Sequence, residues 1–145
     1  TDGVTTYYEH ETGTDQINAG GAVTSVLGSI TSGDFDITQK RSAQGQMIGA
    51  PDLRGDGEYL MKIRRFIPDF ITQTGDTRIT LMLRNYPNNA AASSSLGPFT
   101  ITSSTDKVDT RARARAIALK IQNTAASQDW KLGTFRLDIQ PDGRR

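Results

Sequence analysis

The stretch Tyr59-Leu60-Met61-Lys62-Ile63-Arg64-Arg65-Phe66-Ile67 decides the fold class, because apolar and charged side chains alternate along most of it. Four of its five odd-numbered positions are apolar, whereas Lys62 and Arg64 fall between them. A period of two residues is that of a half-buried β-strand, whose successive side chains point to opposite faces. Pro68 cannot donate a ladder hydrogen bond, so it ends this strand or puts it at an edge.

A second strand follows closely. In residues 78–84, Ile79, Leu81 and Leu83 share one face. The segment between the two strands contains Thr74-Gly75-Asp76-Thr77, which is a turn signal. The two strands are therefore predicted to pair as a hairpin or near-hairpin.

Further strands are predicted on both sides of this pair. Residues 99–102 form a short strand after a polar loop, and residues 134–140 alternate again, with a bulge expected at Gly133. The first 57 residues carry weaker signals, and short strands are predicted there at residues 23–27, 29–30 and 34–37.

Residues 111–122 fit two structures. Their composition favours a helix, with Ala114, Ile117, Ala118 and Ile121 on one face. A helix would leave Leu119 in water, however, whereas a strand places Ile117, Leu119 and Ile121 together. The strand is the prediction.

The chain of 145 residues is predicted to form a single β domain, residues 1–145, of a common size. Its 35% apolar content is low, and its 14 glycines are typical of short strands joined by turns. The predicted fold is all-β and antiparallel: a β-sandwich or jelly roll if self-contained, or terminal blades of a β-propeller within a longer chain. The predicted core consists of Tyr59, Met61, Ile63, Ile67, Ile79, Leu81, Leu83, Ile117, Leu119, Ile121, Phe135, Leu137 and Ile139.

The connections are long for an isolated domain. Residues 1–28 are predicted to be an extended N-terminal arm, and residues 38–57 a long loop. We expect such segments to order against neighbouring subunits. The first residue is Thr1, not Met, so we also expect the chain to be a fragment or a processed product.

Charge and composition exclude several classes of function. The net charge of +1 creates no global field that would steer nucleic acid or an anionic membrane. The absence of cysteine excludes disulfides and thiolate chemistry. Since no apolar run approaches the roughly 18 residues of a membrane helix, membrane insertion is not expected.

Catalytic and metal-binding patterns are weak. His10 is the only histidine, and in a strand its neighbours Glu9 and Glu11 face away from it. The acidic stretch 52–58 lacks the spacing of a calcium loop, and Gly20-Gly21 lacks the Lys and helix of a phosphate loop. The carboxylates Asp34 and Asp36 are close enough to bind a cation, but they equally suit a turn. The prediction is no enzyme, no metal and no cofactor.

The clearest feature is the alternation of arginines at Arg111, Arg113 and Arg115. In a strand their guanidinium groups project from one face about 7 Å apart, close to the spacing of nucleotide phosphates. They can contact a DNA backbone, or they can form ion pairs within the chain or across a subunit interface. The candidate carboxylates are Asp106, Asp109 and Asp138.

The arginines share a face with the apolar row that follows them if the strand is unbroken. Unpaired arginines cannot be buried in a core. Either a bulge near Ala116 reverses the register, or the arginine end runs out of the core into a subunit contact.

Several short motifs resemble structural proteins of tailed-phage virions. The first are Gly33-Asp34-Phe35-Asp36-Ile37, residues 65–70 (RFIPDF) and residues 83–87 (LRNYP). The closing series is the most telling, and consists of residues 111–113 (RAR), 118–121 (ALKI), 130–133 (WKLG) and 138–145 (DIQPDGRR). It resembles the C-terminal region of the tail hub and nozzle group of short-tailed phages, over residues 28–145.

The resemblance implies a β-rich, ring-forming virion component through which the genome passes, and no catalytic residues. The expected function is thus a structural part of the virion, of the tail hub, nozzle or adaptor type. Its expected partners are copies of itself and other virion proteins, with passive contact to genomic DNA. The alternative is a carbohydrate-binding β-sandwich module of a secreted or surface protein, using aromatic side chains such as Tyr7, Tyr8, Tyr86 and Trp130.

Overall fold

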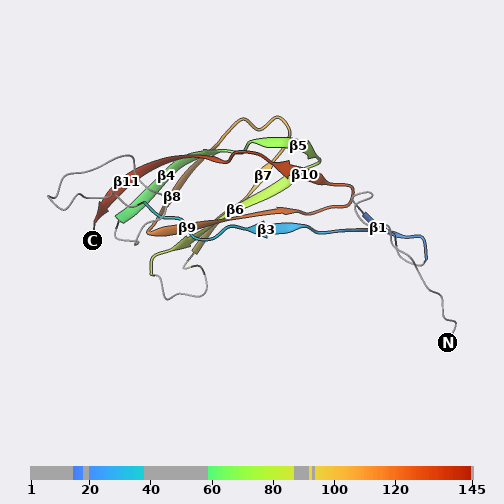
Figure 1. Cartoon of the computed structure of the whole chain (residues 1–145), viewed down its shortest axis with the longest axis horizontal. Coiled ribbons are helices and arrows are strands. Elements are labelled where there is room, and N and C mark those ends of the chain that lie inside the picture. Colours follow the sequence, from blue (N-terminus) through green and yellow to red (C-terminus); the bar gives the residue numbers. More distant parts are fainter. Residues whose placement is uncertain (1–14, 18–19, 38–58, 87–91, 93, 145) are drawn as a thin grey trace.

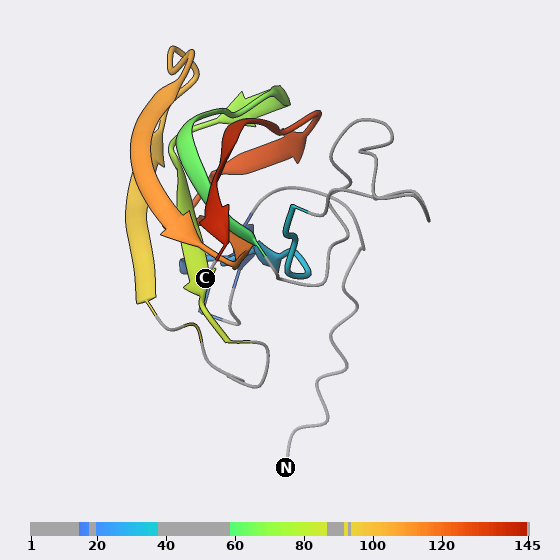
Figure 2. The ribbon, with the colours of Figure 1, turned by 90° about the vertical axis from the view of Figure 1, so that its left-hand side faces the viewer.

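The computed structural model describes residues 15–17, 20–37, 59–86, 92 and 94–144. Two antiparallel sheets pack face to face, and side chains from both form one core cluster (Figures 1 and 2). The strands are β1 (Asp15–Ile17), β2 (Val23–Ser25), β3 (Ser29–Thr31), β4 (Tyr59–Ile67), β5 (Phe70–Thr74), β6 (Thr77–Arg84), β7 (Ser94–Ile101), β8 (Val108–Ala114), β9 (Ala116–Asn123), β10 (Asp129–Leu132) and β11 (Arg136–Arg144).

The strand order is that of a sandwich. One sheet has the order β11-β4-β8 and the other β3-β9-β6-β7, while β10-β5 and β1-β2 form small two-stranded sheets. All the pairs are antiparallel. The predicted all-β, antiparallel class is therefore confirmed, in its sandwich form. No helix that could span a membrane occurs in the part of the chain that the structure describes.

The chain changes sheets at Arg115. Strand β8 pairs with β4, whereas β9 pairs with β6, and the Arg115 amide donates to the Arg84 carbonyl across 3.1 Å. Before this corner the even-numbered residues of β8, such as Ala114, are buried, whereas after it the odd-numbered Ile117 and Ile121 are buried together with Ala118. The segment 111–122 is thus extended, as predicted, but it is two strands. The register reverses next to Ala116, which keeps the arginines out of the core.

A bulge shifts the end of β4. The register with both neighbouring strands slips between Ile63 and Arg65. Beyond the slip Phe66 is completely buried, while Ile67 is only half-buried. The predicted core position Ile67 was wrong, because strict alternation cannot anticipate an inserted residue. The predicted core position Tyr59 was also wrong, since this residue lies at the start of β4 and is only half-buried.

The predicted hairpin was also wrong. Strands β4 and β6 lie in opposite sheets, and β5 intervenes and pairs with β10. The chain turns at Pro68, which is buried, and returns through the tight turn at Gly75, whose φ is +75°. The apolar rows of β4 and β6 consequently belong to facing sheets and do not lie side by side in one sheet.

Gly133 lies at a close approach of two strands, not at a bulge within one. Its amide donates to the Asp69 carbonyl across 2.7 Å, and a Cβ at this position would lie 2.8 Å from the same oxygen. Strands β10 and β11 are separated here, opposite the Pro68 turn between β4 and β5. Only glycine fits this crossing without a shift of the backbone.

The core joins the two sheets through aromatic contacts. Phe66 of β4 stacks on Phe135, with ring centroids 5.4 Å apart, and meets Phe99 of β7 edge-on at 5.5 Å. Phe135 and the predicted Leu119, Leu137 and Ile139 pack against the core but remain partly exposed. The buried hydrophobic residues are Ile37, Leu60, Met61, Ile63, Phe66, Ile79, Leu81, Leu83, Ile101, Ala112, Ala114, Ile117, Ala118 and Ile121.

Truncation of Phe66 tests the bulge. We expect Phe66→Ala to lower the free energy of unfolding by about 3–5 kcal/mol, as for a buried aromatic residue. Ile67→Ala should cost clearly less, because that side chain is half-exposed. Urea denaturation monitored by circular dichroism measures both. Equal losses would place Ile67 in the core and contradict the register described here.

Candidate interaction surface

Strand β8 forms an open edge of the three-stranded sheet. Within the described residues, no strand pairs with its outer side. It runs for seven residues without proline or glycine. Such an edge offers a row of amide and carbonyl groups to another chain, while its charged side chains and its register slip against β4 are features that limit indiscriminate pairing.

The side chains of β8 divide into two rows. Thr110, Ala112 and Ala114 point inward and are buried, whereas Asp109, Arg111 and Arg113 alternate with them and are exposed. The inward row is small. The outer row is charged, with two guanidinium groups two residues apart.

The three predicted site arginines have different surroundings. Arg113 forms an ion pair with Asp142 of β11, where its Nε contacts Oδ2 and its Nη2 donates to the Asp142 carbonyl across 3.3 Å. Arg115 lies at the corner, half-buried and bonded. Arg111 is exposed and forms no ion pair with a described residue. Only Arg111 and Arg113 therefore share the outer face of β8.

The carboxylates proposed from the sequence do not pair with these arginines. Asp109 lies 3.2 Å from the Nε of Arg65, on the neighbouring strand. Asp106 and Asp138 are exposed. The partner that sequence reasoning missed is Asp142, which a register shift between Pro141 and Arg144 displaces from the regular ladder. Only the strand order could have identified Asp142 as the partner of Arg113, because β11 and β8 lie on either side of β4.

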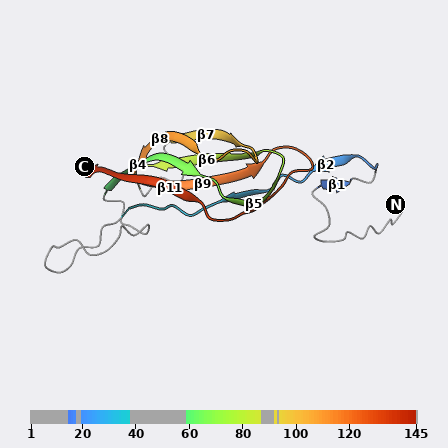
Figure 3. The ribbon, with the colours of Figure 1, turned by 90° about the horizontal axis from the view of Figure 1, so that it is seen from above.

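A groove of about 300 Å³ lies between β8 and β7, which belong to the two facing sheets (Figure 3). It is lined by Leu96 and Phe99 from β7, and by Asp109, Thr110 and Arg111 from β8. The Thr110 hydroxyl is buried there without a hydrogen-bond partner among the described residues. A buried hydroxyl without a partner is costly, so this groove favours an occupant that brings a polar atom.

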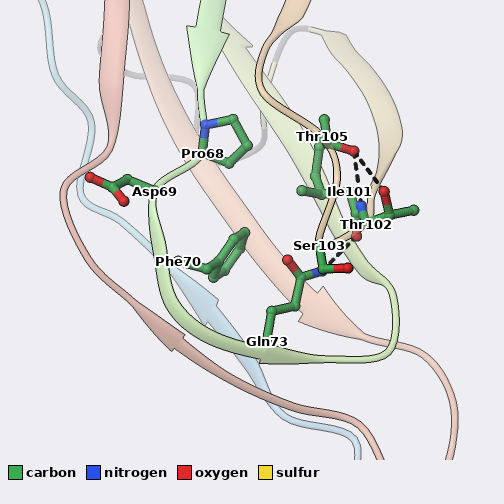
Figure 4. Close-up of a pocket in the computed structure, with 8 residues that line it drawn as sticks. All are labelled: Pro68, Asp69, Phe70, Gln73, Ile101, Thr102, Ser103 and Thr105. Carbon is green, nitrogen blue, oxygen red and sulfur yellow. Dashed lines mark hydrogen bonds between the residues drawn. The ribbon is translucent and has the colours of Figure 1, made fainter.

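A second hollow, of about 200 Å³, lies beside the loop after β7 (Figure 4). Polar groups in its lining form hydrogen bonds with one another. Gln73 Nε2 donates to the Ile101 carbonyl across 2.7 Å, and the Thr102 amide donates to Thr105 Oγ1 across 3.0 Å. These residues therefore stabilise the turn, and we do not assign a binding site to this hollow.

The predicted carboxylate pair is divided between two environments. Asp34 forms an ion pair with Arg84, with Oδ2 and Nε 2.9 Å apart, while Asp36 is buried and bonded. No group of three metal-ligating side chains occurs among the residues described. The Gly20-Gly21 pair lies in the connection between β1 and β2. His10, its two glutamates and residues 52–58 lie outside the described residues.

The aromatic residues do not form a common platform in the part of the chain that the structure describes. Trp130 is half-buried and contacts Phe70 edge-on, with centroids 6.2 Å apart. Tyr86 is 71% exposed. Tyr7 and Tyr8 lie outside the described residues. Carbohydrate binding stays a prediction that no contact here favours.

The root of the N-terminal arm is tied to the sandwich. Ser127, in the turn between β9 and β10, donates to both oxygens of Asp15, from its amide at 2.5 Å and its hydroxyl at 2.6 Å. Strands β1 and β2 lie beyond the ends of the two main sheets (Figures 1 and 3). The arm is therefore anchored at one end of the domain.

A second exposed patch follows β2. Val26, Leu27 and Ile30, here called the 26–30 strip, are 53%, 66% and 53% exposed. Asn123 holds the backbone beneath them, because its Oδ1 accepts from the Gly28 amide at 2.5 Å and its Nδ2 donates to the Val26 carbonyl at 3.0 Å. The strip lies at the β3 edge of the four-stranded sheet, opposite the β7 edge.

Comparison with known proteins assigns no family, because no family model and no curated protein sequence matches the chain.

The Asp15–Ser127 contact predicts a pH dependence. Hydrogen bonds from the Ser127 hydroxyl and amide hold the pKa of Asp15 below its ordinary value of 3.8. A lowered folded-state pKa means that the contact stabilises the arm root above the ordinary pKa and is lost as the pH falls through the lowered one. We expect an NMR titration of the Asp15 carboxyl carbon to show this.

Ser127→Ala should raise the pKa of Asp15, because it removes the hydroxyl donor. Ser103→Ala, in a different loop, is the matched control and should leave that pKa unchanged. The same Asp15 titration curve in wild type and Ser127→Ala would refute the contact.

Proposed function

We propose that this protein is a structural component of a phage virion, of the tail hub, nozzle or adaptor type, and that it acts through symmetric self-assembly and contacts with neighbouring virion proteins. The observation that carries the proposal is the β8 edge, which no described strand covers, with its groove and a buried hydroxyl that has no hydrogen-bond partner among the described residues. The resemblance of short motifs in residues 28–145 to virion proteins is the reason for proposing that the assembly is part of a virion.

The contrast between the two neighbouring edges supports an interface at β8. Strand β7 is also an edge, but it contains Gly97, with φ of +113°, followed by Pro98, and its register slips there. Proline and irregular backbone blunt an edge against pairing. Strand β8 contains neither proline nor glycine. Its register with β4 slips between Asp109 and Ala112, but its buried and exposed side chains still alternate, so it is the edge better suited to a partner.

The two exposed surfaces differ in chemistry. The β8 edge carries arginines beside a groove, whereas the 26–30 strip is apolar and lies at the β3 edge. A twofold dimer uses one patch on both subunits, while head-to-tail contacts use two different patches and close into rings. Two unlike surfaces on one domain favour the second arrangement, which suits a hub or nozzle.

Contact with DNA, in this proposal, is passive. Arg111 of β8 forms no ion pair with a described residue, and the chain has a net charge of only +1. Such contact would be to the phosphate backbone, weak and strongly dependent on salt. The proposal contains no catalytic step.

Measurement of particle mass tests the assembly. We expect light scattering coupled to size-exclusion chromatography of the full chain to show a closed oligomer of constant mass as its concentration rises. Ile30→Asp should reduce that mass towards the monomer, because it places a charge in the 26–30 strip.

Ile71→Asp is the matched control, since Ile71 is similarly exposed, at 63%, but lies on β5 outside the strip. It should keep the wild-type mass. A wild-type chain that remains a monomer at every concentration, alone and with neighbouring virion proteins, would overturn the proposal.

A further inference from the structure

The groove beside β8 adjoins Asp109, Thr110 and Arg111 of this edge strand. Its floor is formed by the buried Thr110, and its far wall by Leu96 and Phe99 of β7. Because Thr110 is short, the space above it is large enough for a bulky side chain. An added strand would place every second side chain in this groove and the others beside the exposed row of β8.

The ligand for this position must therefore have two different faces. One face needs apolar side chains that also carry a hydroxyl, to pack on Leu96 and Phe99 and to meet the Thr110 oxygen. The other face needs carboxylates at a spacing of two residues, to face Arg111 and Arg113.

Residues 4–11 of this chain have this pattern. Their sequence is Val4-Thr5-Thr6-Tyr7-Tyr8-Glu9-His10-Glu11, which is rich in residues that favour strands. In an extended chain Val4, Thr6 and Tyr8 fall on one face, and Glu9 and Glu11 on the other. The spacing of the two glutamates equals that of the two arginines.

We infer that residues 4–11 of a second copy of this chain add to β8 as an extra strand. The Glu9 and Glu11 carboxylates then face Arg111 and Arg113, and Tyr8 enters the groove with its hydroxyl towards Thr110. Backbone pairing supplies affinity, while the charges and the groove supply specificity. This inference rests on the proposed self-assembly and names the contact that would link the copies.

The anchoring of the arm favours exchange between copies. Asp15 is held by Ser127 at the end of the domain, and β1 lies beyond the main sheets (Figure 1). The preceding residues therefore start from a point outside the sandwich, where a neighbouring copy can receive them. Each copy can then give an arm to one neighbour and receive an arm from another, which makes the contact head-to-tail.

Charge reversal provides the test. One full-length variant carries Glu9→Arg with Glu11→Arg, and another carries Arg111→Glu with Arg113→Glu. Each alone sets like charges against each other, so we expect each to drop from the oligomer to the monomer in light scattering. An equimolar mixture should form oligomers that neither variant forms alone, because every arm in an alternating assembly then meets a complementary edge.

Asp142→Asn is the matched control, since it removes the ion pair of Arg113 but leaves both arginines, and it should keep the wild-type mass. Circular dichroism confirms that each variant is folded. A chain that lacks residues 1–14 should also be monomeric, which tests the inference without altering β8.

The outcomes separate the inference from the proposed function. If the wild type is oligomeric and the reversed variants keep its mass, or lose it and form no oligomers in the mixture, the arm contact is refuted and self-assembly stands. If removal of residues 1–14 lowers the melting temperature without changing the mass, the arm binds its own copy, which overturns the exchange. A wild type that is always monomeric refutes self-assembly itself.

Discussion

The reversal of side-chain phase at Arg115 is the constraint on which the rest of the structure depends. Without it, the arginines of β8 and the apolar row of β9 would share one face, and three guanidinium groups would enter the core. The desolvation of unpaired charges would exceed anything that burial of the isoleucines returns. A corner fixed by one backbone hydrogen bond, from Arg115 to Arg84, separates the two rows and sends each strand to a different sheet.

The position of this corner also creates the candidate surface. Because the chain leaves β8 for the other sheet, β8 has β4 as its only neighbour among the described strands, and none of these covers its outer side. The same crossing brings β8 next to β7, which belongs to the facing sheet, and the groove lies between them. The open edge, the exposed arginines and the buried Thr110 hydroxyl are thus consequences of a single change of sheet.

Sequence periodicity predicted the parts of this fold that depend on local alternation. It identified β4, β6 and the extended character of residues 111–122, since a strand that buries one face must alternate. It failed where one residue was inserted, as at the β4 bulge before Phe66, or where a strand changed partner, as at Pro68 and Gly133. These features depend on contacts between residues distant in sequence, such as the Gly133 amide with the Asp69 carbonyl.

The candidate site divides in the same way. The outward direction of Arg111 and Arg113 follows from alternation, but the ion pair with Asp142 and the groove wall of Leu96 and Phe99 require the strand order. Thr110 could be expected to face inward from its spacing to Ala112. The lack of a hydrogen-bond partner for its hydroxyl among the described residues could not be predicted, because that depends on which groups the neighbouring strands place beside it.

The small inward row of β8 argues for occupation of this edge over simple protection of it. Proteins protect an edge with charged side chains, inward-pointing charges, a short strand, a bulge or a proline. Here the charged side chains of β8 point outward. Its inward positions are the small residues Thr110, Ala112 and Ala114, which leave room for the side chains of an added strand. The neighbouring β7 shows that this domain does use an interrupted backbone, at Gly97-Pro98. Strand β8 has no proline or glycine, and its register slip between Asp109 and Ala112 leaves the alternation of its side chains intact, which is consistent with an edge that receives a strand.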